Sequence, residues 1–364
     1  MREPNAVDFW RGFALVTIFI NHIPGNFFER FTYSGYFLSD AAELFVFLAG
    51  WSLALATESK GVPEPPTRVI LRLSYRTIEV YRAQLVIAVL ALAIISGAAL
   101  YLDNPLLLEW HNAGLFYSDP VQASVGFVLL SYQLGYFNIL PLYVALLAIA
   151  PVFILLARFR RWLAFALSAM IYLTALTLEL NLPNWPGEGD WFFNPLAWQF
   201  LFVSGFLSSV WARESETFRS WAKRLLPLAL LGVLPGIAIS LWDLKPDPFN
   251  VPEPRLLFLF DKSNLSPARM FDFTMVVLAF YQMYPWIQYR LPGLTSFLSA
   301  LGRNSLSVFA VGSILDLVAQ LIRSAEPRSF VLDTCLVGAG MLGLWFTAWF
   351  AEWRSRSPRS SLSR

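Results

Sequence analysis

Long apolar stretches constrain the fold of this chain more than any other feature of its sequence. Each is about 20 residues long, and a helix of that length crosses a hydrocarbon core of about 30 Å. Ten of them follow one another, at residues 9–26, 39–57, 79–101, 135–157, 162–180, 194–211, 225–242, 270–289, 304–322 and 331–351. The apolar segment 121–134 has two interpretations, a re-entrant segment or the start of the helix over 135–157. We therefore predict an all-α, polytopic integral membrane protein with about ten transmembrane helices.

The low charge of the chain agrees with a membrane location and excludes some other classes. Only 14% of its 364 residues are charged and 57% are hydrophobic, whereas soluble domains carry about 25% charged residues. The chain has two histidines and one cysteine, so we expect no His- or Cys-rich metal site. Its net charge of +2 is spread along the sequence, so we expect no nucleic-acid partner.

Basic residues are distributed unevenly between the connecting segments, and this predicts the orientation. Lys and Arg gather in the cytoplasmic loops of membrane proteins. The segments 102–120 and 181–193 contain neither residue, so we place them outside. The alternate segments are basic and should lie inside, with Lys60, Arg68, Arg72, Arg76, Arg158, Arg160, Arg161, Arg213, Arg219, Lys223, Arg224, Arg290 and Arg303. Both termini are then cytoplasmic, with residues 1–352 forming one membrane domain and 353–364 a short basic tail.

The first apolar stretch carries a stripe of ionisable residues. Arg11 and His22 are eleven residues apart, which is about three helical turns, so both lie on one face and about 16 Å apart along the axis. Asp8 lies on the same face, three residues before Arg11. Ionisable groups inside a membrane are costly and usually functional, so we expect this stripe to face the interior of the helix bundle.

Glu43 is the predicted partner of His22. It lies about one turn inside the outer end of the second apolar helix, and His22 lies at a similar depth in the first. A carboxylate beside an imidazole fixes its tautomer and steadies the imidazolium. The pair could therefore act as a general base that takes a proton from an attacking hydroxyl. The alternative is a structural polar pair between two helices.

The third apolar stretch is preceded by a row of arginines. Arg68, Arg72 and Arg76 recur every four residues and share one helix face. Such a row could hold phosphates through charge-assisted hydrogen bonds, or it could simply mark a cytoplasmic end. Arg82 lies inside the apolar run, where a buried charge needs a partner, and we expect that partner to be Glu79 or Glu43.

Several stretches together resemble the OpgC family of the membrane acyltransferase-3 superfamily. They are DFWRGFALVTIFINHIPGN, SDAAELFVFLAGW, YRAQL, LGYFNILPLYVALLAIAP, FNPLAWQFLFVSG, DKSNLSPARMFDF and LGRNSLSVFAVGS, in this order between about residues 6 and 320. The resemblance implies a ten-helix acyltransferase of the bacterial inner membrane, with cytoplasmic termini. It also implies acyl-CoA as co-substrate, succinyl-CoA in the member for which the family is named, without a permanently bound cofactor. The acceptor would be a hydroxyl of a periplasmic glucan, and the partners would be the bilayer and the glucan-synthesis machinery.

The resemblance also implies roles for single residues. The superfamily's pattern of an arginine, ten residues and a histidine matches Arg11 and His22, which makes His22 the catalytic residue. The acidic residue of the family's second helix corresponds to Glu43. The arginine row becomes a candidate site for the CoA phosphates. The remaining candidates for supporting or substrate-binding roles are Asp8, Arg11, Arg82, Asn138, Lys262, Asn264 and Arg269.

Of these candidates, four lie near the predicted outer face: Asn138 near the outer end of the fourth helix, and Lys262, Asn264 and Arg269 where an outer loop meets the eighth. Lys262 and Asn264 could donate to the developing oxyanion or to acceptor hydroxyls. Arg269 could pair with a succinyl carboxylate. For each, loop capping or interface anchoring is the alternative interpretation.

The chain departs from the family pattern at two positions, and these departures leave alternatives open. Gln84 and Asp272 stand where the family leads us to expect histidines. They bear on the identity of the acyl group and the acceptor more than on acyl transfer itself. One alternative is an O-acyltransferase for another envelope polysaccharide. Others are a glycan transporter or flippase, and a non-enzymatic scaffold. Tryptophans in the outer segments fit either interface anchoring or stacking on sugar rings.

Overall fold

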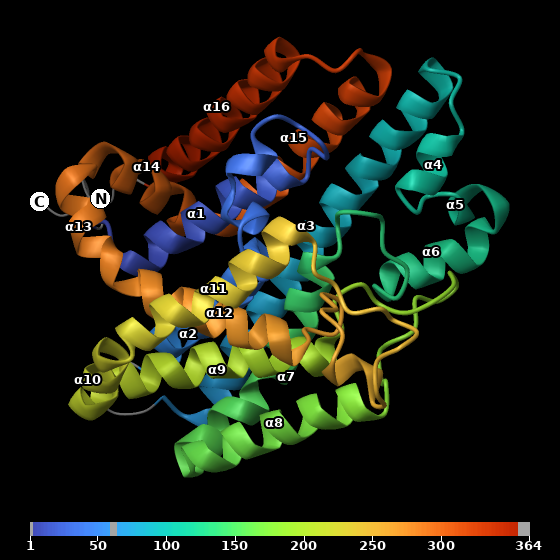
Figure 1. Cartoon of the computed structure of the whole chain (residues 1–364). Helices are drawn as coiled ribbons and strands as arrows, with labels where there is room; N and C mark the ends of the chain where they lie inside the picture. Colours follow the sequence, from blue (N-terminus) through green and yellow to red (C-terminus); the bar gives the residue numbers. More distant parts are fainter. Residues whose placement is uncertain (1–2, 59–63, 356–364) are drawn as a thin grey trace, which may run out of the picture. The chain divides into compact units, whose positions relative to one another are not determined.

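The computed structural model describes residues 3–58 and 64–355, and this part of the chain is built from helices (Figure 1). An isolated β-bridge between Pro183 and Asp190 is its one β feature. The α-helices are α1 Ala6–Asn21, α2 Ala41–Thr57, α3 Pro66–Tyr101, α4 Leu106–Trp110, α5 Leu115–Ser118, α6 Pro120–Val128, α7 Ile139–Phe159, α8 Arg161–Thr177, α9 Pro195–Glu214, α10 Glu216–Arg224, α11 Leu226–Trp242, α12 Pro267–Phe280, α13 Tyr284–Arg290, α14 Pro292–Arg303, α15 Ser305–Ala325 and α16 Phe330–Ser355. Short 3-10 turns are η1 Glu29–Phe31, η2 Tyr33–Gly35, η3 Arg255–Leu257 and η4 Tyr281–Met283.

The helices confirm the all-α prediction and support a membrane protein. By length and composition, α3, α7, α9, α15 and α16 could each cross a membrane. A sixth crossing results if α10 and α11, which meet at a bend of 54°, count as one broken span. α3 and α16 leave many large apolar side chains exposed, and a bilayer would cover that surface. Ten crossings and cytoplasmic termini remain predictions.

Several helix boundaries differ from those predicted. α1 ends at Asn21, so His22 is its C-cap residue and not one turn inside the helix. The helix stops because Pro24 follows closely and Gly25 has a positive φ of 71°, a conformation that suits a chain turning away from a helix. The stretch 121–134 forms the separate helix α6 and a loop.

The prediction of one continuous helix over 270–289 is also wrong. It is divided into α12, η4 and α13, and Pro285 near the start of α13 removes a donor that a continuous helix would need. α3 begins earlier than predicted, at Pro66, where a proline at the first helical position costs no hydrogen bond. The arginine row therefore lies on this helix.

The described residues form two compact units. The terminal unit consists of the described residues up to Thr32 and from Met283, and it contains α1 and α13–α16. Here α1 packs against α14 with almost no space between the backbones. A Cβ added to Gly12 would lie 1.9 Å from the Leu298 carbonyl oxygen, and one added to Gly302 would lie 1.8 Å from the Asp8 carbonyl oxygen. Glycine is thus required on both helices.

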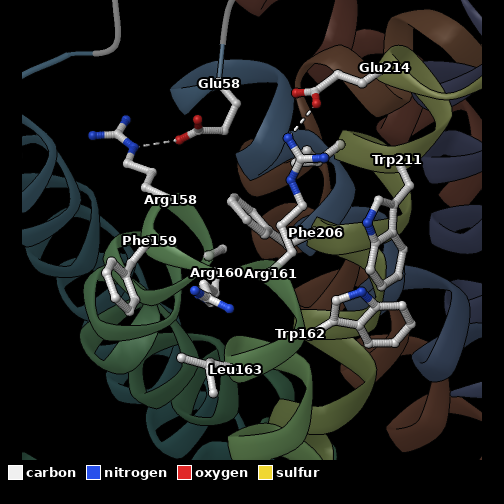
Figure 2. Close-up of a pocket in the computed structure, with 12 residues that line it drawn as sticks. Glu58, Arg158, Phe159, Arg160, Arg161, Trp162, Leu163, Phe206, Trp211 and Glu214 are labelled. Atoms are coloured by element: carbon white, nitrogen blue, oxygen red, sulfur yellow. Dashed lines mark hydrogen bonds and ion pairs between the residues drawn. The ribbon is translucent and has the colours of Figure 1, made fainter.

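The central unit, Tyr33–Gln282, contains α2–α12. Its closest helix pair is α2 and α9. Gly50 faces the carbonyl oxygen of Phe202, 1.9 Å from where a Cβ would be, and Gly205 faces that of Phe47 at 2.1 Å. α7 packs against α3, α8 and α9. A cavity lies at the ends of α2, α7 and α9 and the start of α8 (Figure 2).

Candidate active site

His22 is paired with a buried aspartate of its own unit. Its Nδ1 lies 3.1 Å from Oδ2 of Asp316 on α15, and the side chains of the two residues are 24% and 2% exposed. A carboxylate can only accept, so this contact favours the tautomer in which Nδ1 carries the hydrogen. Nε2 is then the basic nitrogen. The Gln320 side chain donates to the backbone oxygen of His22 and holds the end of α1 in place.

Arg11 also contacts α15. Its guanidinium donates to the hydroxyl of Ser305. The two contacts of α1 advance by eleven residues on both helices, from Arg11 and Ser305 to His22 and Asp316. α1 and α15 therefore run in the same direction here, and the predicted stripe is directed toward α15. Asp8, also buried, accepts from the Asn5 side chain at 2.5 Å and donates its own amide to Asn5.

Asp316 is the functional candidate that sequence reasoning missed. It is an ionisable residue inside the predicted span 304–322, and the argument that drew attention to His22 applies equally to it. What the sequence could not supply was the pairing, because the two residues are 294 positions apart.

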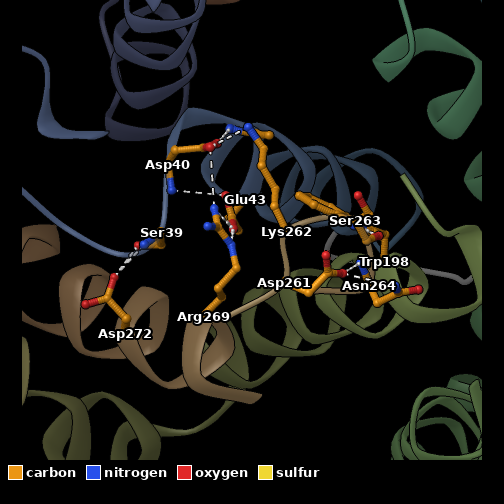
Figure 3. Close-up of polar contacts among 11 residues, drawn as sticks. Ser39, Asp40, Glu43, Trp198, Asp261, Lys262, Ser263, Asn264, Arg269 and Asp272 are labelled. Carbon is orange, nitrogen blue, oxygen red and sulfur yellow. Dashed lines mark hydrogen bonds and ion pairs between the residues drawn. The ribbon is translucent and has the colours of Figure 1, made fainter. Parts of the chain in front are cut away.

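Glu43 belongs to a network in the central unit (Figure 3). Its Oε1 accepts from Nε of Arg269 at 2.7 Å, and its Oε2 accepts from the backbone N–H of Asp40 at 3.0 Å. Asp40 in turn accepts from the amide of Ala42 at 2.8 Å, which completes a capping box at the start of α2. Both oxygens of Glu43 thus have partners within this unit. A role for Glu43 in supporting His22 remains a prediction.

The cations of this network are engaged as well. Arg269 is 8% exposed and reaches Oδ2 of Asp40 at 3.4 Å in addition to Glu43. Nζ of Lys262 lies 2.5 Å from the same oxygen. Arg269 is therefore bound to the protein's own carboxylates, and this geometry favours a structural role for it over binding a succinyl carboxylate. Lys262, 35% exposed, is the most exposed member of this network.

Asn264 builds local structure in the central unit, and Asn138 lies at the start of a helix there. Asn264 bonds to Asp261 through its backbone N–H at 2.6 Å, and it accepts from the Asn194 side chain at 2.8 Å. These contacts fasten the loop before α12 to the start of α9, which is the loop-capping interpretation. Asn138 is the N-cap residue of α7, but its side chain makes no capping hydrogen bond.

The arginine row on α3 is partly neutralised, and the predicted pairing of Arg82 is wrong. Arg72 pairs with Glu64 at 3.0 Å, and Arg76 pairs with Glu79 at 2.6 Å. Arg68 and Arg82 are exposed. Glu79 and Glu43 are each engaged by another arginine, and Arg82 makes no ion pair with any residue that the structure describes.

Both departures from the family pattern are buried. Gln84 donates to the carbonyl oxygen of Phe137 at 3.1 Å. Asp272 accepts from the backbone N–H and the hydroxyl of Ser39 at 2.8 and 2.7 Å. Both residues therefore tie a helix to a neighbouring loop within the central unit.

The second histidine has a different environment. His111 lies after α4, is 0% exposed, and neither ring nitrogen has a hydrogen-bond partner among the described residues. Burial lowers the pKa of this imidazole to about 4. It remains neutral at pH 7, and within the described part of the chain no carboxylate forms a hydrogen bond to either ring nitrogen, so it is a poor candidate for a general base.

The apolar helices define a helical membrane protein, and one of its two histidines is held by a buried carboxylate. A family model described as "OpgC protein" matches residues 2–356, nearly the whole chain. The chain belongs to the OpgC family. Membership suggests an acyltransferase of osmoregulated periplasmic glucans, which agrees with the resemblance noted in the sequence. No curated protein and no solved structure matches the chain.

Proposed function

We propose that this protein is an O-acyltransferase with His22 as its general base. It transfers an acyl group, succinyl in the first instance, from acyl-CoA to a hydroxyl of a periplasmic glucan. The observation that carries the proposal is the contact between His22 and Asp316 in a chain of the OpgC family. No resident cofactor is needed, because the thioester itself supplies the activated acyl group.

The proposed reaction uses one proton transfer in each direction. Nε2 of His22 takes the proton of the acceptor hydroxyl while the hydroxyl oxygen attacks the thioester carbonyl carbon. The C–O bond forms, the C–S bond breaks, and the proton held by His22 passes to the leaving sulfur. The products are an ester and free CoA, and His22 is again neutral. A positioned base of this kind accelerates the reaction by about 10²–10⁴-fold.

Asp316 acts through His22 as a positioning residue. Its carboxylate holds Nδ1–H and favours the imidazolium that forms during attack. Arg11, on the same side of α1, is proposed to extend the site along this helix. Lys262 is proposed to contact acceptor hydroxyls, since it is the cation of the central network that reaches solvent.

The proposed topology separates donor from acceptor. The donor is proposed to bind on the cytoplasmic side and the acceptor on the periplasmic side, and the distribution of Lys and Arg supports the orientation that this requires. The protein would then reside in the bacterial inner membrane, and the acyl group would cross without transfer of CoA. The glucan-synthesis machinery is the proposed supplier of the acceptor.

Release of free CoA by purified protein in nanodiscs tests this function. Succinyl-CoA and acetyl-CoA are supplied separately, with and without a β-glucan. We expect glucan-dependent thiol release that falls at least 100-fold in His22→Ala. Lys245→Ala is the control, because Lys245 is exposed and its ion pair is with Asp243 at the surface. Full turnover by folded His22→Ala would contradict the proposed mechanism. If no CoA is released with a broad panel of donors and acceptors, a glycan transporter becomes the favoured function.

A further inference from the structure

The central unit contains a cavity that the proposed site does not use. Its volume is about 870 Å³, and it is lined by the junction of α7 and α8 together with the ends of α2 and α9 (Figure 2). The orientation predicted from the loops places these ends on the cytoplasmic side. Three arginines line it: Arg158, Arg160 and Arg161. Their roles can be separated by their partners.

Arg158 is committed to the fold. It pairs with Glu58 at 3.0 Å and donates to the carbonyl oxygens of Glu64 and Thr57 at 2.8 and 3.2 Å. Thr57 is the last residue of α2, so the guanidinium satisfies carbonyl groups that a helix end leaves open. Every branch of this side chain is therefore engaged, and a ligand would have to displace structural bonds to use it.

Arg160 and Arg161 are more open. The Arg160 side chain is exposed and makes no ion pair with a described residue. Arg161 pairs with Glu214 at the rim, and both side chains are partly exposed, at 38% and 54%. An exposed pair of this kind is held only weakly, so Arg161 can be shared with a second anion. The exposed part of the cavity thus contains two guanidinium groups, those of Arg160 and Arg161, and one carboxylate, that of Glu214.

Aromatic rings stand beside these arginines. The rings of Trp162 and Trp211 are 5.5 Å apart at an interplanar angle of 44°, and Trp162 is 71% exposed. Phe159 and Phe206 also line the cavity. Exposed tryptophan beside arginine suits a ligand that carries a flat heterocycle next to phosphate, since rings stack on bases and guanidinium groups bind phosphate in a bidentate manner.

We infer that this cavity binds the phosphorylated adenine nucleotide of the acyl donor, with Arg160 and Arg161 on phosphate and Trp162 against the base. The inference rests on the proposed function, in which the donor is a CoA thioester. It assigns the nucleotide to the junction of α7 and α8 in place of the arginine row on α3. In that row two of the three arginines are already paired with glutamates.

Binding of adenosine 3′,5′-bisphosphate, measured by calorimetry in nanodiscs of phosphatidylcholine, tests this assignment. The probe has no acyl group, so it reports on the cavity whether or not transfer occurs. We expect Arg160→Ala to weaken binding about 10-fold or more, and Trp162→Ala to weaken it about 5-fold or more. Arg68→Ala, which removes an exposed arginine from the competing row, should leave binding unchanged.

Two results would overturn the assignment. One is unchanged binding in Arg160→Ala and Trp162→Ala, with or without loss in Arg68→Ala. The other is binding that is insensitive to Trp162 and is matched by inorganic phosphate or displaced by phosphatidylglycerol in the nanodisc, which would identify a site for phosphate or lipid headgroups alone. If the nucleotide binds as expected but no acyl-CoA is turned over, the proposed function fails and the cavity assignment stands. If acyl transfer is intact in Arg160→Ala with an unchanged KM for acyl-CoA, the cavity assignment fails alone.

Discussion

The two polar centres of this protein each hold a nitrogen-bearing side chain beside a buried carboxylate, yet they differ in how exposed that side chain is. In the terminal unit, the imidazole of His22 contacts the carboxylate of Asp316, and the His22 side chain is 24% exposed. In the central unit, Arg269 joins two carboxylates, and Glu43 is 0% exposed with both oxygens engaged. The first arrangement orients an imidazole ring through its Nδ1. The second is closed, and it fastens α12 to the start of α2.

Among the variants that test this difference between the two centres, Asp316→Asn is expected to have the largest effect. Asp316→Asn removes the carboxylate that holds Nδ1–H of His22, and we expect acyl transfer to fall about 10²–10⁴-fold while the unfolding temperature in detergent changes little. The pH profile of kcat should also shift toward the behaviour of an unassisted imidazole. Asp316→Glu, which retains a carboxylate, should recover part of the activity. An equal loss of acyl transfer in Asp316→Asn and Asp316→Glu, with an unaltered pH profile of kcat, would indicate that Asp316 serves only in packing.

In the central unit the corresponding change should act on stability. Arg269→Met leaves the buried Glu43 without its guanidinium partner, and breaking a buried pair in this way costs about 3–5 kcal/mol. We expect a strongly lowered unfolding temperature and little folded protein. Lys262→Met is the matched variant, because Lys262 is 35% exposed and bonds the same Asp40 oxygen. It should cost at most about 1 kcal/mol, and comparable losses in the two variants would contradict the closed-network interpretation.

The second histidine provides a test that is independent of catalysis. The pKa of His111 is about 4 in the folded protein against 6.5 for an ordinary histidine. Below pH 6.5 the unfolded chain therefore binds a proton that the folded chain does not. Stability should fall as the pH is lowered from 6.5 toward 4, by about 2 kcal/mol at pH 5.

The measurement is the unfolding temperature in detergent between pH 7.5 and 4.5. His111→Phe removes the titrating group and should flatten this part of the curve. A curve of the same slope in that variant would assign the acid sensitivity to other groups.

The smallest of these effects concerns packing, in which the two units are alike. Gly50→Ala places a methyl group 1.9 Å from the Phe202 carbonyl oxygen, and overpacking of this kind costs about 1–3 kcal/mol. Gly12→Ala in the terminal unit should behave similarly. Gly97→Ala in α3 is the control, since no atom lies within 4 Å of the added methyl group. Destabilisation by the control to the same extent would mean that the close helix contacts are not what limits these positions.

The sequence predicted elements better than it predicted pairings. Long apolar stretches predicted every described helix that could cross a membrane, because a helix that crosses the hydrocarbon core needs about 20 consecutive, mostly apolar residues. The short helices α10 and α14 were missed, since neither contains a run long enough to be recognised in this way. The predicted end of the first helix, at residue 26, is too late, because α1 ends at Asn21. Pro24 and Gly25 are a local stop signal that marks this end.

Partners were harder to predict than elements. Asp316 and Arg269 reach His22 and Glu43 from 294 and 226 positions away, and no local rule connects them. One local rule was available. Asp40 and Glu43 have the spacing of a capping box, which predicts that Glu43 bonds back to the helix start and favours the structural interpretation that the coordinates support.

The length of α3 determines where the bilayer surface must lie on the central unit. Its 36 residues give a rod of about 54 Å, far longer than a hydrocarbon core of about 30 Å. The end that carries Arg68, Arg72 and Arg76 therefore projects beyond the acyl chains into the headgroup layer and the water behind it. Because these side chains resist entry into hydrocarbon, thickening of the bilayer cannot draw this end inward. The helix must instead tilt or shift its opposite, uncharged end. The charged end therefore fixes the depth of α3 in the bilayer.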